Sequence, residues 1–325
     1  MAIYFLNMNS VGRTNGSSAV SAAAYRSGER LRDERTGRTY DHTERQDVLH
    51  KEIFLPTEFT TDDMSWAKDR GSLWNAAERA ESRANSRVAR EYLLALPSEL
   101  SPQQRIILVT AFSRELVERY RFAVDVAIHA PRDYPGSDPR NFHAHLLATT
   151  REVALEGLGA KTTLEWSDAR RRESGMEPAV SELFYTRARW ASTANLALEE
   201  AKLPERIDHR TLAAQGIDRE PGPRIPRAAY EMERHGYRSV VAERLRAEHQ
   251  ARVGARLQRA AQHTAAIAPQ NAVESKNPED IRRQAVEDWL RYREVHARKQ
   301  SQTGAQTETQ PVLPAAASRK NDYSL

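Results

Sequence analysis

The sequence predicts an α+β fold with a mainly antiparallel central sheet and flanking helices, followed by a helical and disordered tail. Segments with strand-like alternation are interleaved with segments of helical periodicity in the part of the chain before residue 222. The strands expected at 122–129 and 142–151 are joined by a turn-rich loop of the hairpin type, which favours antiparallel pairing. From about residue 263 onward the chain is polar and rich in Ala, Gln, Ser and Thr, which is typical of disorder.

The predicted strands are short segments that are apolar or that alternate between apolar and polar residues. They are expected at 2–8, 47–55, 88–96, 122–129 and 142–151. Pro56 and Pro97 end two of these strands, because proline cannot donate to a sheet. We also expect 39–40 to pair with 47–55 as a hairpin, and 9–17, which is rich in Gly, Ser and Asn, to form a loop.

The predicted helices are segments in which apolar or small residues recur at helical spacing. They are expected at 18–32, 62–83 (as one or two helices), 102–119, 177–201 and 227–262. Ser101 is a suitable N-cap for the helix at 102–119, and Pro178 suits the first turn of the helix at 177–201. Trp66, Trp74 and Trp190 lie in amphipathic helices, so we expect them to pack in the core rather than to stack on nucleic-acid bases.

The amino-acid composition limits the chemistry that the protein can use and indicates the compartment in which it acts. The 325 residues include ten histidines and no cysteine, which excludes disulfides and thiolate metal sites and suits a reducing cytoplasm. The chain has no apolar run of about 18 residues, and its N-terminus lacks the basic region of a signal peptide. We therefore expect a cytoplasmic protein without membrane insertion. The net charge of +4 permits a nucleic-acid partner without establishing one.

A Pro/Gly-rich bend at 220–226 divides the predicted organisation. We expect a folded domain at 1–222, a basic helical extension at 223–262 and a mostly disordered polar tail at 263–325. A helical pattern returns within the tail at 278–299. The helix expected at 227–262 contains eight arginines, which fits a phosphate-contacting arm, a surface for an accessory protein or simply a solvated helix.

The sharpest local motif is His143-Ala144-His145. Residues two apart on a strand point to the same face, so both imidazoles can reach one cation. His129 ends the preceding strand and joins them if the two strands pair around the turn. Three imidazoles leave metal positions open for substrate, as catalytic sites require. An isolated His-x-His is more often a pair of surface histidines, and the third histidine makes the two interpretations about equal.

Two carboxylates and one tyrosine are further candidates. Glu91 could orient a ligand imidazole, although the sequence alone favours an exposed glutamate at a sheet edge. Asp125, four residues before His129, is either a partner of the histidines or a solvated charge. Tyr25 lies in a helix whose small residues would allow close approach to the sheet, so its hydroxyl could act as a nucleophile. The small residues expected on its face are Ser18, Ser21 and Ala22. A helical tyrosine taken alone is more often a packing residue.

Together, these motifs resemble the MobA/MobL family of plasmid relaxases, which are HUH endonucleases. Four blocks in this order carry the resemblance and span about residues 1–222: MAIYFLNMNSVGRTNGSSAVSAAAYRSG, WNAAERAESRANSRVAREYLLALP, VDVAIHAP with NFHAHLLATTR, and RIDHRTLAAQGIDREPG. The resemblance implies a ferredoxin-like relaxase fold for 1–222. The sequence departs from many relatives after Pro221, which weakens any inference about DNA contacts there.

Carried over position by position, the resemblance implies that Tyr25 is the nucleophile. It implies that His129, His143 and His145 bind a divalent metal ion, Mg²⁺ or Mn²⁺, and that Glu91 orients a histidine. The implied reaction is strand-specific nicking and rejoining at an origin of transfer through a 5′-phosphotyrosine, which initiates conjugative transfer. The implied partners are single-stranded or supercoiled plasmid DNA, relaxosome accessory proteins and the coupling protein of a type IV secretion system.

Three other functions remain open from the sequence. A rolling-circle replication initiator or transposase uses similar residues, but there the tyrosine usually follows the histidines, whereas Tyr25 precedes them. A metallohydrolase would activate water and leave Tyr25 as a structural residue. A non-catalytic single-stranded DNA-binding protein would have a decayed site, and the intact set of tyrosine, glutamate and three histidines argues against it.

Overall fold

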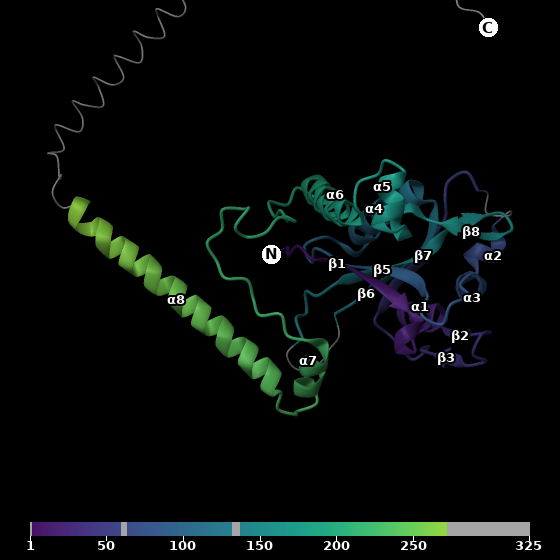
Figure 1. Cartoon of the computed structure of the whole chain (residues 1–325), viewed down its shortest axis with the longest axis horizontal. Helices are drawn as coiled ribbons and strands as arrows, with labels where there is room; N and C mark the ends of the chain where they lie inside the picture. The colour runs from purple at the N-terminus through teal and green to yellow at the C-terminus, as the bar shows by residue number, and fades with distance from the viewer. Residues whose placement is uncertain (1, 60–63, 132–136, 272–325) are drawn as a thin grey trace, which may run out of the picture. The chain divides into compact units, whose positions relative to one another are not determined.

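The computed structural model describes residues 2–59, 64–131 and 137–271 (Figure 1). The chain divides into two compact units, Met1–Asp218 and Arg219–Leu325. No helix in the described part of the chain is both long and apolar enough to cross a membrane.

An antiparallel sheet forms the centre of the first unit. Its strands are β1 (Leu6–Gly12), β4 (Val48–Phe54), β5 (Arg87–Ala95), β6 (Phe122–His129), β7 (His143–Ala154) and β8 (Gly157–Lys161). They lie in the order β1-β5-β7-β6-β4, with β8 paired to β7, and neighbouring strands are antiparallel. A separate small sheet pairs β2 (Arg30–Arg32) with β3 (Thr39–Asp41). The predicted α+β class with a mainly antiparallel sheet is confirmed.

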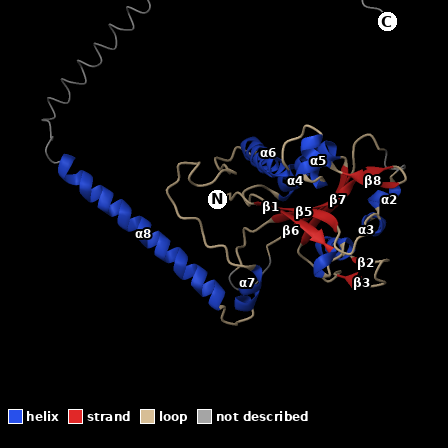
Figure 2. Ribbon diagram, viewed as in Figure 1, coloured by secondary structure: helices blue, strands red, loops and turns tan. Residues whose placement is uncertain are grey.

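Helices cover both faces of the sheet (Figure 2). One face packs against α4 (Pro102–Tyr120) and α6 (Ala179–Glu200). The other packs against α1 (Ala19–Ser27), α2 (Ser65–Lys68) and α3 (Arg70–Arg79). The short helix α5 (Asp168–Glu173) precedes α6. The buried Trp190 lies in the first core and the buried Trp74 in the second, which confirms their predicted packing role; Trp66 is partly buried against the second core.

Strand β6 shows how the sheet separates apolar packing from polar chemistry. Val124 and Val126 belong to the core under α4 and α6. Asp125, Ala127 and His129 alternate with them and therefore face the side of α1 and α3. All eight residues of β6 are buried, so the polar side chains among them need partners within the protein.

Several predicted elements match the structure closely. Strand β6 has the predicted bounds, and β5 and α6 differ from prediction by one or two residues at their ends. Ser101 caps α4 as predicted: its side chain accepts from the backbone N–H of Gln104, whose side chain accepts from the backbone N–H of Ser101. This capping box satisfies donors that the first turn leaves without helical partners.

The N-terminal elements differ from prediction. The hairpin of 39–40 with 47–55 is wrong, because β3 pairs with β2 and β4 pairs with β6. Helix α1 ends at Ser27 instead of 32, where Gly28 takes the left-handed conformation at φ +64°. Strand β1 begins at Leu6 and includes 9–12, which we expected to be loop. As an edge strand it tolerates polar residues such as Asn9, so its sequence lacks a clear apolar pattern.

The second unit contains two helices in its described part. These are α7 (Arg227–Arg234) and α8 (Val240–Asn271), so the single helix expected at 227–262 is wrong. Gly236 has φ +81° between them, a conformation that ends a helix. Helix α8 also continues past 262, into the segment expected to be disordered. The remainder of the predicted tail, including the helical pattern at 278–299, lies outside the described residues.

Asp125 anchors helix α3 to the sheet. Arg70 donates to it through Nε at 2.8 Å and Nη2 at 2.9 Å, and Trp74 donates through Nε1 at 2.8 Å. The interpretation of Asp125 as a solvated charge or a partner of the histidines is therefore wrong. Its carboxylate is buried and fully engaged by α3, where it compensates the charge of Arg70.

We predict that Asp125→Ala lowers the free energy of unfolding by about 3–5 kcal/mol, because the buried Arg70 keeps only its bond to Glu29 and the buried Nε1 of Trp74 loses its acceptor. Urea unfolding followed by circular dichroism measures the loss. Glu115→Ala is the matched control. Glu115 accepts a bidentate pair of hydrogen bonds from Arg189, at 2.7 and 3.0 Å, on the solvent-exposed side of α4 and α6. The control should cost no more than about 1 kcal/mol; equal losses in both variants would contradict this account.

Candidate metal and nucleophile site

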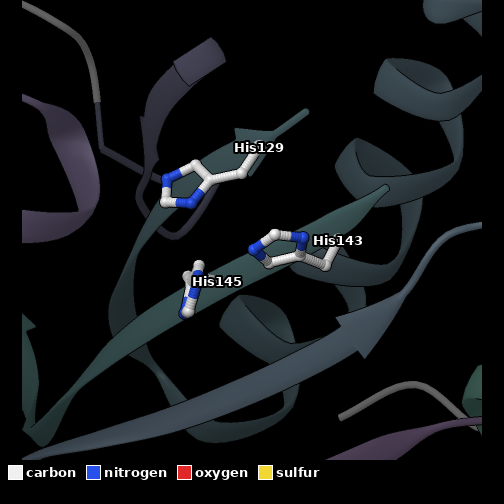
Figure 3. A group of neighbouring side chains, drawn as sticks. All are labelled: His129, His143 and His145. Carbon is white, nitrogen blue, oxygen red and sulfur yellow. The ribbon is translucent and has the colours of Figure 1, made fainter. Parts of the chain in front are cut away.

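Three histidines gather on the α1 side of the sheet, where β6 ends and β7 begins. In the antiparallel register His129 lies directly opposite His143, and His145 follows two residues later on the same face. The ring centroids are 5.3 Å apart for His129–His143 and His143–His145 and 4.8 Å apart for His129–His145. One ring nitrogen from each histidine lies within 4.8 Å of those of the other two. Figure 3 shows the three rings grouped around one space.

The surroundings of His143 and His145 orient both rings. Nδ1 of His143 lies 2.9 Å from the carbonyl oxygen of Asn141, and Nδ1 of His145 lies 2.6 Å from Oε1 of Glu91. Both contacts are hydrogen bonds when Nδ1 carries the proton, so each Nε2 keeps its lone pair for a cation. Partners of this kind fix the tautomer and direction of metal-binding imidazoles.

His129 is the most buried of the three histidines. Its Nε2 lies 2.7 Å from the carbonyl oxygen of Arg26, and its Nδ1 lies 3.3 Å from Nη2 of Arg45. Since arginine only donates, Nδ1 accepts and Nε2 donates. Burial lowers the pKa of His129 to about 3, and the charges of His145, Arg45 and His143 act in the same direction against the raising effect of the Arg26 carbonyl. The imidazole is therefore neutral at neutral pH, as a ligand must be.

Glu91 joins the histidines to helix α1. It is buried in β5 and accepts from Nδ1 of His145 and from Nε and Nη2 of Arg26, the two arginine bonds both being 2.7 Å long. Burial alone would raise the pKa of Glu91, but the bonds and charges of His145 and Arg26 outweigh it and lower the pKa to about 2. The sequence-based preference for an exposed edge glutamate is wrong. Glu91 is an internal carboxylate that holds one imidazole.

Tyr25 projects from α1 into a cavity beside this cluster. The cavity has a volume of about 500 Å³ and is lined by Tyr25, His42, Arg45, Gln46, Asp47, Ala130 and Pro131. The last two lining residues directly follow His129, and the Tyr25 side chain is 37% exposed. Tyr25 is therefore partly open to solvent at a cavity large enough to admit part of a substrate.

Helix α1 approaches the sheet by a different face from the one expected. Three of its five buried residues are the alanines Ala19, Ala23 and Ala24, and the other two are Val20 and Ser27. Ser18, which we expected on the face of Tyr25, is the N-cap of the helix, and its side chain accepts from the backbone N–H of Ser21. The close approach of the helix is therefore made by alanines on one face, and this leaves Tyr25 on a neighbouring, more open face.

The sequence interpretation missed two arginines, Arg26 and Arg45. Arg26 contacts Glu91 through its side chain and His129 through its carbonyl oxygen. Its position immediately after Tyr25 was a signal that could have drawn attention to it. Arg45 stacks on the Tyr25 ring, and no local pattern marks it, because its position depends on how the segment between β3 and β4 folds.

Comparison with known proteins identifies the family of the chain. The model of the MobA/MobL family matches residues 17–235. The mobilization protein MobL of Acidithiobacillus ferridurans is 36% identical over 253 residues, which cover 72% of this chain and 64% of that protein. Mobilization protein A of Escherichia coli is 35% identical over 253 residues, which cover 75% of this chain and 32% of that protein. The chain thus spans less than two thirds of the length of these relatives.

A solved structure is also similar to this chain. It is described as "Molecular Basis of Vancomycin Resistance Transfer in Staphylococcus aureus", and its chain superposes with a TM-score of 0.51 at 27% identity. The match covers 65% of the present chain and all of the other one. By the extent of the family match and by the identity to mobilization proteins, the chain belongs to the MobA/MobL family.

Proposed function

We propose that the chain is a plasmid mobilisation relaxase that nicks and rejoins one DNA strand at an origin of transfer. The observation that carries the proposal is the cluster of His129, His143 and His145 beside a cavity into which Tyr25 projects. The mobilization proteins among its relatives support the same reaction class. The enzyme would act in the cytoplasm on single-stranded or supercoiled plasmid DNA.

The histidine cluster has the donor set for a divalent cation, Mg²⁺ or Mn²⁺ in this proposal. Nδ1 of His143 and of His145 already contacts a protein oxygen, so Nε2 of each would be the atom that binds the ion. His129 would exchange its contact with either Arg45 or the Arg26 carbonyl for the ion. A ligand set of nitrogens alone favours Mn²⁺ over Mg²⁺, which prefers oxygen. When bound, the cation neutralises charge on the scissile phosphate and aligns it for attack.

Tyr25 supplies the nucleophile in this reaction. Its hydroxyl gives up a proton as the phenolic oxygen forms a bond to phosphorus. The bond from phosphorus to the 3′ oxygen breaks, and the released 3′ oxygen takes up a proton, so no net proton is gained or lost. The products are a 5′-phosphotyrosine and a free 3′-OH. Because one phosphodiester replaces another, the reverse attack of the 3′-OH rejoins the strand without a nucleotide cofactor. Glu91 takes no part in these bonds and holds His145 in its orientation.

The proposed organisation assigns the reaction to residues 1–222. Every proposed site residue lies before that limit, and the first compact unit ends close to it, at Asp218. The basic segment 223–262 would contact DNA phosphates or relaxosome accessory proteins. A coupling protein of a type IV secretion system would receive the DNA-linked product.

We predict that Tyr25→Phe abolishes the covalent protein–DNA adduct and leaves DNA binding nearly unchanged, because the substitution removes only the attacking oxygen. A labelled single-stranded oligonucleotide from the adjacent origin, incubated with Mn²⁺ and resolved on a denaturing gel, reports the adduct. Tyr40→Phe is the matched control and should keep it. Adducts at the wild-type level in Tyr25→Phe would make Tyr4 or Tyr40 the candidate. Cleavage by the wild type without any adduct would indicate a metallohydrolase.

The histidine cluster gives a second prediction. EDTA should stop cleavage, excess Mn²⁺ or Mg²⁺ should restore it, and His143→Ala should weaken Mn²⁺ binding measured by calorimetry. Glu91→Gln should lower metal affinity or cleavage less strongly, by about 10–100-fold, because it alters only the support of His145. DNA binding away from the cut should survive in both variants, since it depends on arginine and lysine contacts. Full cleavage by His143→Ala in the presence of chelator would contradict a metal-dependent reaction.

The proposed domain limit gives a third prediction. A fragment of residues 1–222 should fold and retain oligonucleotide nicking in vitro, while mobilisation in cells is lost if the basic segment contacts a partner. Circular dichroism checks the fold and the denaturing gel checks the nicking. A folded fragment that cannot nick would show that the segment after 222 belongs to the active domain.

A further inference from the structure

We propose that Arg45 is a positioning residue that fixes the ring and the backbone of Tyr25 beside the histidine cluster. This inference rests on the proposed role of Tyr25 as the nucleophile. The Arg45 guanidinium carbon lies 4.3 Å from the centroid of the Tyr25 ring. Its Nη1 donates to the Tyr25 carbonyl oxygen at 2.7 Å. One side chain therefore holds the tyrosine at two points, its ring and its main chain.

The end of helix α1 explains why the main-chain contact matters. The last turn of a helix leaves carbonyl oxygens without helical donors, and positive groups are favourable there. Side chains from outside the helix donate to three consecutive carbonyls: Arg45 to Tyr25, His129 to Arg26 at 2.7 Å, and Lys51 to Ser27 at 3.2 Å. The turn that bears the tyrosine is thus attached to a proposed metal ligand on one side and to Arg45 on the other.

Arg45 is itself held in place. Nε and Nη2 donate to the two carboxylate oxygens of Asp47 at 2.8 and 2.5 Å, and both side chains are mostly buried. The backbone carbonyl of Asp47 accepts from the N–H of Ala130 at 2.8 Å. Ala130 follows His129 in the chain, so the contacts form a closed path from Tyr25 through Arg45 and Asp47 to the histidine cluster.

The donors of Arg45 distinguish positioning from phosphate binding. A guanidinium has five N–H donors. Four of them are directed at protein atoms: two at Asp47, one at the Tyr25 carbonyl and one at Nδ1 of His129. An arginine that binds phosphate would instead direct two parallel N–H donors of its guanidinium at the substrate. His42 meets the Tyr25 ring edge-on at 5.3 Å, which adds a second contact to the same ring.

The test separates the rate of attack from DNA binding. Under single-turnover conditions with Mn²⁺ and the origin oligonucleotide, Arg45→Met should form the Tyr25 adduct about 10–100-fold more slowly than wild type, because a small misplacement of reacting groups costs rates of this order. Its affinity for the oligonucleotide, measured by fluorescence anisotropy, should stay within about threefold, the loss expected when no phosphate contact is removed. Arg189→Met removes a comparable bidentate ion pair with Glu115. This variant should match the wild type in both assays.

A measurement without DNA tests the contact itself. In ¹H–¹³C spectra of tyrosine-labelled protein, the Tyr25 ring signal is identified by its loss in Tyr25→Phe. It should shift in Arg45→Met and stay in place in Arg189→Met. Arg45→Lys should recover little of the rate, because an ammonium keeps the charge without the planar fork. If Arg45→Met is unstable, Asp47→Asn, which weakens the anchor of Arg45, should slow adduct formation in the same direction.

Three results would overturn the proposal: adduct formation by Arg45→Met at the wild-type rate, an unshifted Tyr25 signal, or a loss of DNA affinity as large as the loss of rate. The last result would make Arg45 a phosphate contact. If the wild type forms no adduct at Tyr25, the proposed nicking function fails, whatever the role of Arg45. The spectra would still decide whether Arg45 fixes the ring, so the two failures can be told apart.

Discussion

The antiparallel register of β6 and β7 is the constraint on which the site depends. It places His129 opposite His143, and the period of two along β7 adds His145 to the same face. A slip of one residue would turn these histidines towards the apolar core under α4 and α6. Val126 and Leu146, which pair across the same two strands, belong to that core. The apolar packing of one face therefore fixes the polar chemistry of the other.

Helix α1 is a short element that packs on the sheet mainly through alanines, and small side chains alone give it little resistance to sliding. Polar contacts fix the position of the helix on the sheet. Arg26 binds Glu91, which also holds His145, and the Arg26 carbonyl accepts from His129. The same contacts that orient the imidazoles thus fix the helix that bears Tyr25. A change in the orientation of the histidines would therefore also move the proposed nucleophile.

The sequence was most informative where one local period dominates. The alternation in 122–129 predicted β6, and the spacing of His143 and His145 predicted their common face. Local patterns failed where partners come from distant segments. Glu91 looks like an edge residue until β1 and β7 cover both sides of β5. Arg45 has no sequence pattern at all, because its role arises from a loop that meets α1 and the end of β6.

The charges around the histidine cluster are balanced within the protein. Arg26 is paired with Glu91, Arg45 with Asp47 and Lys51 with Glu29, while the lowered pKa of His129 keeps its imidazole neutral. A phosphodiester that entered beside these groups would therefore find positive charge that is already compensated. Neutral imidazoles are also the form in which histidine binds a cation. This balance argues that the charge opposing a scissile phosphate would come from an ion held by the histidines, and that the arginines serve to hold the geometry.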